Sequence, residues 1–293
     1  MKTLWNKTQE EKFFLKSLEF ATPEQLFYQT DNNRLYAYWP KGYKGKKTTL
    51  QSRNSLIGSF TEKWTTDLFS EIANKLEGYA VQGAICDEIA LTSQSPADVA
   101  ICKTNKINQK PQDILMIIEV KMSIVWNWEL ISNNSEFNLI CIGDYNTHQG
   151  TPSLLRSDSM LKAIGKSINI RVSSFAASKI PIIILGNTPI TKNYYDKVDH
   201  LKKNGIIQGF WSVNPKPLDK NGENIKQTER KGFYRIDNYQ ELKMFTFDLV
   251  TKDREFFSSM LSKRRLGEII EIANKEQTYE GKAQRFLKLL RES

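Results

Sequence analysis

Apolar and polar positions recur along the chain with two different periods, and these periods predict its helices and strands. Residues 8–27 read as helical, with Thr22 suited to cap a second helix. In residues 56–76 an apolar side chain recurs at every fourth position, which predicts an amphipathic helix with one buried stripe. A further helix is predicted over residues 157–171.

Apolar runs of strand length fill the middle of the chain. Residues 78–93, with a bend at Gly83, precede two shorter runs at 95–103 and 114–123, and together they predict a three-stranded meander. The run PIIIL at residues 181–185 is typical of a fully buried strand. Since it follows a predicted crossover helix, we expect it to lie parallel to its neighbour.

The predicted order from residue 56 onward is therefore helix, three strands, helix, strand (α-β-β-β-α-β). This order predicts a mixed α/β (α+β) fold, in which a mixed central sheet is flanked by helices. An N-terminal helical region with a basic arm (1–55) precedes the core (56–190), and a C-terminal strand and helix subregion (191–293) follows it. No linker interrupts the chain, so we expect one elaborated domain. In the subregion we expect strands at 206–214, 233–236 and 243–250, then two helices within 253–290.

The distribution of charge along the chain indicates what kind of partner the protein binds. The 293 residues carry 42 Lys and Arg against 33 Asp and Glu, a net charge of +9. Two stretches, 32–61 and 159–195, contain basic residues and no acidic ones. One-sided basic stretches favour contact with a polyanion such as a nucleic-acid backbone. A solvated basic surface has the same pattern.

The spacing of the cysteines and the hydropathy of the chain indicate in which compartment the protein works. Cys86, Cys102 and Cys141 lie far apart in apolar sequence, no CxxC motif occurs, and the chain has only two histidines. This pattern predicts buried thiols in a reducing cytosol and no zinc site. No window approaches the roughly twenty apolar residues of a membrane span, so we expect a cytoplasmic protein with no membrane partner.

The candidate chemistry lies in the meander. Asp98 stands near the start of one apolar run, and Glu119 and Lys121 stand two apart at the end of the next, on the same face of a strand. If the two runs pair as a hairpin, two carboxylates and one ammonium meet at one edge of the sheet. Adjacent carboxylates repel unless a cation bridges them, and oxygen ligands favour a hard ion such as Mg²⁺. An edge strand with a solvated Glu–Lys pair is the structural alternative.

These residues carry a family resemblance. Pro96-Ala97-Asp98, followed after a polar loop by an apolar run and Glu119-Val120-Lys121, resembles the PD-(D/E)xK nuclease superfamily, and most of all its type II restriction endonucleases. The resemblance implies a restriction-endonuclease-like catalytic core at 56–190. It also implies Mg²⁺, with Mn²⁺ as a substitute, held by Asp98, Glu119 and the carbonyl of Val120. Lys121 would act on the attacking water, and cleavage would leave 5′-phosphate ends.

Two acidic residues nearby leave the ligand set open. Glu62 lies on the predicted helix before the first strand, where the superfamily often has a metal-binding or catalytic glutamate, although an exposed helix glutamate fits the sequence equally well. The family often has proline directly before the aspartate, whereas Ala97 intervenes here. Asp87 therefore stays an alternative to Asp98.

The resemblance further implies double-stranded DNA as substrate, a homodimer matched to palindromic sites, and a companion DNA methyltransferase. The candidate DNA contacts share basic or base-reading side chains. They are Lys41, Lys44, Lys46, Lys47 and Arg53 in the first basic stretch, Asn146, His148, Gln149 and Arg156 in a polar loop, and Lys162 and Lys166 on the following helix. Alternative functions are a non-catalytic DNA-binding protein, a repair or junction nuclease of the same superfamily, and a metal-dependent RNase.

Overall fold

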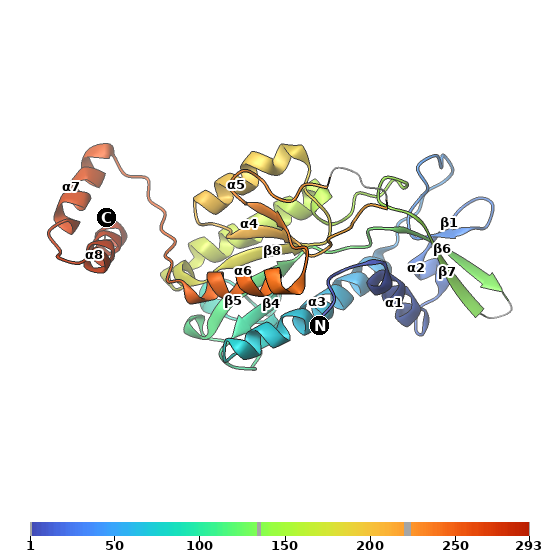
Figure 1. Cartoon of the computed structure of the whole chain (residues 1–293), viewed down its shortest axis with the longest axis horizontal. Helices are drawn as coiled ribbons and strands as arrows, with labels where there is room; N and C mark the ends of the chain where they lie inside the picture. The colour runs from blue at the N-terminus through green and yellow to red at the C-terminus, as the bar shows by residue number, and fades with distance from the viewer. Residues whose placement is uncertain (1, 134–135, 220–223, 293) are drawn as a thin grey trace. The chain divides into compact units, whose positions relative to one another are not determined.

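A six-stranded mixed sheet, in the order β10-β9-β8-β5-β4-β3, forms the centre of the larger part of the chain (Figure 1). Its strands are β3 (Tyr79–Ala84), β4 (Ala97–Cys102), β5 (Ile114–Val120), β8 (Ile182–Gly186), β9 (Gly209–Ser212) and β10 (Phe233–Arg235). The first three form the antiparallel meander that the sequence predicts, and β8 lies parallel to β5. The prediction of a mixed sheet flanked by helices is therefore confirmed.

Helices cover both faces of this sheet, as Figure 1 shows. The helices of this part are, among the described residues, α1 (Lys7–Leu18), α2 (Pro23–Leu26), α3 (Gln51–Lys75), α4 (Ser157–Ser173), α5 (Tyr195–Lys203) and α6 (Tyr239–Thr251), of which α1 and α2 pack on α3. Strand alternation explains the two layers. Val99 and Ile118 pack in one apolar cluster with Phe69 of α3, whereas Ala100 and Ile117 pack with α4 on the other face.

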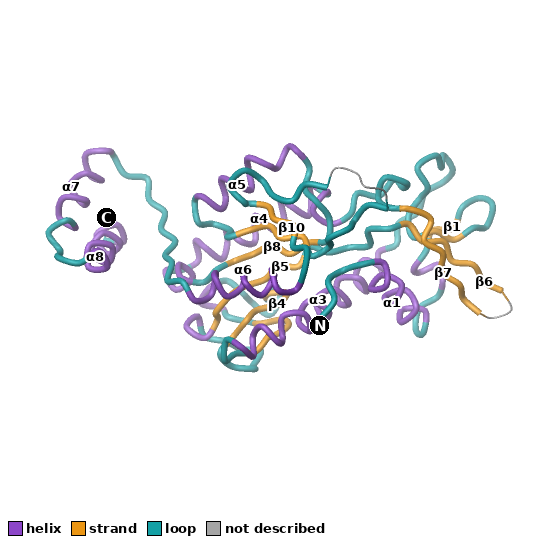
Figure 2. Tube along the Cα trace, viewed as in Figure 1, coloured by secondary structure: helices purple, strands orange, loops and turns teal. Residues whose placement is uncertain are grey.

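A second, antiparallel sheet in the order β1-β2-β6-β7 lies beside the first (Figure 2). Its strands are β1 (Tyr28–Gln29), β2 (Leu35–Tyr36), β6 (Asn127–Asn133) and β7 (Glu136–Gly143). The hairpin β6–β7 follows β5 directly and is inserted between the meander and α4. The periodicity of the sequence gives no clear prediction there, so this addition to the core is a finding of the structure.

Buried Glu10 ties the first helix to the start of β6. Its carboxylate accepts hydrogen bonds from the backbone N–H of Val125 (2.6 Å) and Trp126 (3.1 Å) and from the indoles of Trp128 (3.0 Å) and Trp5 (3.2 Å). Burial nevertheless dominates and raises the pKa of Glu10 to about 7. The N-terminal helix is therefore fixed to the segment that follows strand β5.

The structure describes residues 2–133, 136–219 and 224–292, which divide into two compact units, Met1–Arg254 and Glu255–Ser293. In the second unit α7 (Lys263–Ala273) and α8 (Tyr279–Arg291) pair as expected. Ser262 and Thr278 cap these helices by accepting a backbone N–H in each first turn.

Two predictions differ from the structure. Residues 243–250 form part of helix α6 and not a strand, because Leu242, Thr246 and Leu249 share its buried face and Asn238 caps it by accepting the N–H of Glu241. Helix α3 also begins earlier than predicted, at Gln51. Consequently Arg53 belongs to a helix and not to the basic arm.

Candidate active site

The β4–β5 hairpin brings the predicted charged residues together. The register that pairs Val99 with Ile118 sets Asp98 opposite Glu119. Lys121 Nζ lies 2.6 Å from Glu119 Oε1 and 3.5 Å from Asp98 Oδ2. Asp98 Oδ2 also accepts the backbone N–H of Val120 at 2.7 Å, so this side chain extends the strand pairing to the next residue.

A second lysine completes the cluster from helix α4. Lys166 Nζ lies 2.6 Å from Glu119 Oε2 and 3.2 Å from Asp98 Oδ1, and it donates a hydrogen bond to the carbonyl of Pro96 at 2.7 Å. Each carboxylate is therefore held between two ammonium groups. The sequence singles out Lys166 as a DNA contact, and the structure places it in the acidic cluster.

Burial strengthens the interactions between the charges of this cluster and shifts the pKa values of its members. Glu119 is 4% exposed, and its Oε2 has no hydrogen bond even though the Lys166 ammonium lies within ion-pair distance. Burial and then the negative charge of Asp98 raise the pKa of Glu119, against the opposing effect of both lysines. Burial alone would lower the pKa of Lys121, but Glu119 and Asp98 outweigh it and the pKa is raised.

Glu62 approaches the same cluster from helix α3. It is half-buried, and its Oε2 accepts a hydrogen bond from Gln82 Nε2 of β3 at 3.2 Å. Burial raises its pKa, as does the nearby charge of Asp98, while Lys121 and Lys166 oppose the shift. The alternative ligand Asp87 is exposed at the start of a short 3-10 helix, Asp87–Ile89. Asp98 is therefore better placed than Asp87 to bind a metal ion together with Glu119.

The donor set of the cluster fits a hard divalent cation. Within the described part of the chain, no three His, Cys, Asp or Glu side chains gather as a ready metal site. Asp98 and Glu119 still offer carboxylate oxygens, one of them buried without a hydrogen bond, and the Val120 carbonyl accepts Lys121 Nζ at 3.1 Å. One or two carboxylates with several waters is a usual environment for Mg²⁺.

A set of hydrogen bonds behind Lys121 joins three distant stretches of chain. Ser153 Oγ donates to the carbonyl of Lys121 at 2.5 Å, and Ser153 N donates to Ser123 Oγ at 2.7 Å. Asn187, which follows β8, donates to the carbonyl of Ser123 at 2.7 Å and accepts its N–H at 3.2 Å. These bonds fix the backbone that carries Lys121. In the sequence, the only signal for this role is that polar residues such as Asn187 follow directly after a buried strand.

The predicted DNA contacts divide into exposed and buried residues. The exposed ones are Lys41, Lys44, Lys46 and Lys47 in the loop before α3, Asn146 and Gln149 after β7, and Arg156 and Lys162 at the start of α4. Arg53 and His148 are buried. Both ring nitrogens of His148 engage the backbone, Nε2 with Val125 O at 3.1 Å and Nδ1 with Gly150 N at 3.1 Å, and burial lowers its pKa to about 4. His148 is thus a structural residue in this fold and does not reach out to bases.

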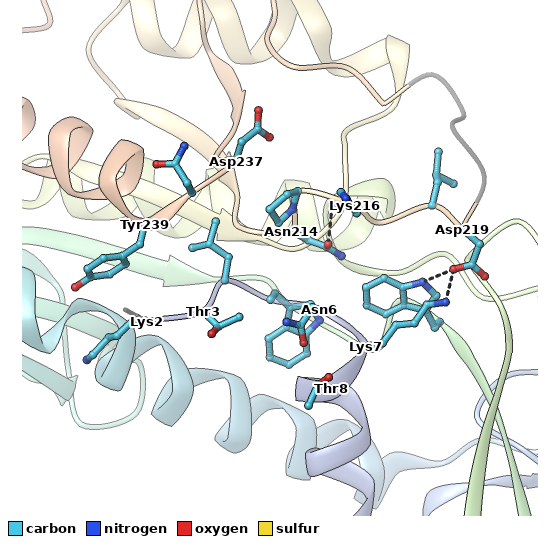
Figure 3. Close-up of a pocket in the computed structure, with 16 residues that line it drawn as sticks. Lys2, Thr3, Asn6, Lys7, Thr8, Asn214, Lys216, Asp219, Asp237 and Tyr239 are labelled. Atoms are coloured by element: carbon cyan, nitrogen blue, oxygen red, sulfur yellow. Dashed lines mark hydrogen bonds and ion pairs between the residues drawn. The ribbon is translucent and has the colours of Figure 1, made fainter.

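Two cavities lie near these elements. One of about 600 Å³ opens beside Lys121 and is lined by Lys47, Arg53 and Arg156 among others. The other, of about 800 Å³, lies along the N-terminal segment, where Lys7 pairs with Asp219 at 2.6 Å (Figure 3). None of the clustered charged residues lines this second cavity.

Comparisons with known proteins add no family. A scan of family models, a search of curated proteins and a search of solved structures each return no match for this chain. Within the described residues, every helix is too short or too polar to cross a lipid bilayer. The geometry of the charged cluster is therefore the basis for assigning a function.

Proposed function

We propose that this protein is a Mg²⁺-dependent endonuclease of the PD-(D/E)xK superfamily that hydrolyses phosphodiester bonds of double-stranded DNA, as type II restriction enzymes do. The observation that carries the proposal is the convergence of Asp98, Glu119 and Lys121 at the adjoining ends of β4 and β5. Buried Glu119 and half-buried Asp98, with the Lys121 ammonium 2.6 Å from the former and 3.5 Å from the latter, supply both a cation site and a group that acts on water.

Each residue has a defined part in this chemistry. Asp98, Glu119 and the Val120 carbonyl would hold Mg²⁺, or Mn²⁺ in its place, and Glu62 would add a ligand directly or through water. Such an ion, when bound, neutralises charge on the phosphate oxygens and lowers the pKa of a bound water. Lys121 orients that water for in-line attack, and Lys166 holds the buried side of Glu119. The products would carry a 5′-phosphate and a 3′-hydroxyl.

The same resemblance extends the proposal to the protein's setting. A restriction enzyme cutting both strands of a palindromic site would act as a homodimer in the cytoplasm, beside a DNA methyltransferase that protects the host. The free thiols Cys86 and Cys102, both buried, support a reducing environment.

A plasmid assay tests the proposal. Supercoiled plasmid is incubated with the protein and Mg²⁺, with the protein and EDTA, and with the variants Lys121→Ala and Lys203→Ala. We expect discrete metal-dependent fragments from the wild type and from Lys203→Ala, whose side chain is exposed and lies outside the proposed site, and none from Lys121→Ala. Offering junction DNA and RNA beside the plasmid separates the repair nuclease and the RNase from the restriction enzyme.

One observation favours a second candidate, a DNA-binding protein without catalysis. Because Lys121 and Lys166 together balance the charges of Asp98 and Glu119, these four groups carry no net charge without any metal ion. A structural ion-pair cluster has this property too. The binder would retard the plasmid in a gel and leave it intact with or without Mg²⁺.

A further inference from the structure

The cavity beside Lys121 is strongly cationic. It has a volume of about 600 Å³ and lies between the segment that follows β2, the first turn of α3 and the segment that precedes α4. Four cationic side chains line it, namely Lys47, Arg53, Lys121 and Arg156, and no Asp or Glu is among the described residues of its wall. The charge of Lys121 is already matched by Glu119, so Lys47, Arg53 and Arg156 give the cavity its positive character. Such a cavity attracts an anion.

A continuous series of aromatic and guanidinium groups runs along the cavity, and its members Tyr28, Tyr38, Trp39 and Arg53 line the wall. Neighbouring members lie between 4.0 and 5.2 Å apart, measured between ring centroids or from the guanidinium carbon to a centroid. Their order is Tyr43, Trp39, Tyr28, Arg53, Tyr38 and His148. Each inner ring is in contact with two other members of the series, so these rings are engaged within the protein and do not form a platform for a nucleobase. Their edges, the positive part of an aromatic ring, are what an anion in the cavity would meet.

Arg53 is the central member of this series, and its charge has no carboxylate partner among the described residues. Its side chain is 3% exposed in total, and the guanidinium donates only to neutral acceptors: the carbonyls of Leu26 and Ala37 and the hydroxyl of Tyr28. A buried charge without a counter-charge is costly. Its position in the wall of the cavity would let a bound anion supply that counter-charge.

Two exposed cations complete the site. Lys47 donates to Gln149 Oε1 at 2.5 Å, and Gln149 in turn donates to the carbonyls of Pro40 and Tyr43. These hydrogen bonds hold the basic loop beside the cavity, which both Lys47 and Gln149 line. Arg156 lies on the other side, 3.4 Å from the exposed carboxylate of Asp158. Guanidinium and ammonium groups together are the usual partners of phosphate.

We propose that this cavity binds a phosphate group of the DNA strand, adjacent to the one held at Asp98 and Glu119. The inference rests on the proposed function, because it takes DNA as the ligand, and it adds where the strand is held and that no base stacks there. The phosphate is either an internal phosphodiester or a terminal monoester, since both carry the same oxygens.

Binding without cleavage tests the inference. The affinity for a fluorescent duplex is measured in EDTA over a range of salt concentrations, for the wild type, for Lys47→Ala/Arg156→Ala, and for Lys12→Ala/Lys203→Ala, which removes two exposed charges elsewhere. We expect the cavity variant to lose about tenfold or more in affinity at low salt. Its slope of log affinity against log salt should fall by about 0.9 for each lost phosphate contact. The control should keep the wild-type slope.

Three DNA forms distinguish the source of the phosphate: closed circles, linear duplexes with 5′-phosphate and linear duplexes with 5′-hydroxyl ends. An equal loss for all three indicates an internal phosphodiester, and a loss confined to phosphorylated ends indicates a terminal one. Either result supports the cavity as a phosphate site. If the wild type cuts DNA but Lys47→Ala/Arg156→Ala has the wild-type slope of log affinity against log salt, the phosphate site in the cavity is overturned and the proposed nuclease activity is not. If the cavity variant has the reduced slope but the wild type never cuts DNA, the phosphate site stands and the proposed nuclease activity is overturned.

Discussion

The Lys166 ammonium and the buried Oε2 of Glu119 lie 2.6 Å apart, so helix α4 supplies a cation to the carboxylate that strand β5 brings to the site. This pair joins the two layers of the fold at the point where we propose catalysis. It also means that Glu119 keeps a counter-charge when no metal ion is bound.

Replacing Lys166 with methionine should therefore destabilise the protein. Glu119 would be left buried beside Asp98 with only Lys121 to oppose the charge, and breaking a buried pair costs about 3–5 kcal/mol. Thermal unfolding in EDTA measures the loss. Lys162→Met, one turn away and exposed, should stay within about 0.5 kcal/mol of the wild type.

Metal ions should rescue this variant if Asp98 and Glu119 form the cation site. We expect Mg²⁺ or Mn²⁺ to raise the melting temperature of Lys166→Met more than that of the wild type, because the ion takes over the charge of the missing ammonium. Equal metal responses of the two proteins would argue against a cation site at these carboxylates.

Lys121→Ala should separate catalysis from DNA binding. General acid–base groups contribute about 10²–10⁴-fold to rate, and we expect a loss of that order in plasmid cleavage. Affinity for DNA should change by only a few-fold, because most phosphate contacts lie elsewhere. A circular-dichroism melt of the variant controls for folding. Cleavage at the wild-type rate would remove Lys121 from the mechanism.

Glu10 should make stability depend on pH. Its pKa in the folded protein is about 7 against an ordinary value of 4.5, so the folded state binds the proton more tightly than the unfolded chain. Its contribution is fully present below pH 4.5 and is lost as pH rises to about 7. A shift of this size corresponds to about 3 kcal/mol. Denaturant unfolding at several pH values measures it.

The variant Glu10→Gln is the control for that measurement. It should be flatter over the same pH range, since the amide does not titrate. It should also be less stable at low pH by about 1–3 kcal/mol, because its NH₂ would face N–H donors. A wild-type stability curve as flat as that of the variant would contradict the role of Glu10.

His148→Phe tests whether this residue supports the fold or contacts DNA. Phenylalanine keeps the ring beside Tyr38, which lies 4.0 Å away, but loses the hydrogen bonds to Val125 and Gly150. We expect a loss of about 1–3 kcal/mol in the free energy of unfolding. The sites cut in DNA of known sequence should stay the same. Altered sites would restore His148 as a base contact.

The sequence predicts the centre of this fold well, because its strongest pattern lies there. Asp98 and Glu119 end or begin apolar runs, and strand alternation places Lys121 on the same face as Glu119. Lys166 shows the limit of that reasoning. The helical period places it on a polar face with Lys162, but which of the two meets the sheet depends on how α4 packs.

A segment whose apolar residues fit both the strand period and the helical period can also be predicted wrongly. In residues 243–250, Phe245, Phe247 and Leu249 alternate as in a strand, while Leu242, Thr246 and Leu249 follow the helical period. Asn238 with Glu241 three residues later was the local signal for a helix start. The burial of Arg53 has no such signal, because it follows from the stacking of distant rings.

The hydrogen bonds among Ser123, Ser153 and Asn187 also bear on how the protein can be divided. A break in the exposed chain at Thr151 would leave Asp98, Glu119 and Lys121 on one fragment and Lys166 on the other. The two pieces would then share both the hydrogen bonds behind Lys121 and the charges in front of it. Recovered DNA cleavage would thus report reassembly of the halves, and the fold lends itself to a split-protein sensor.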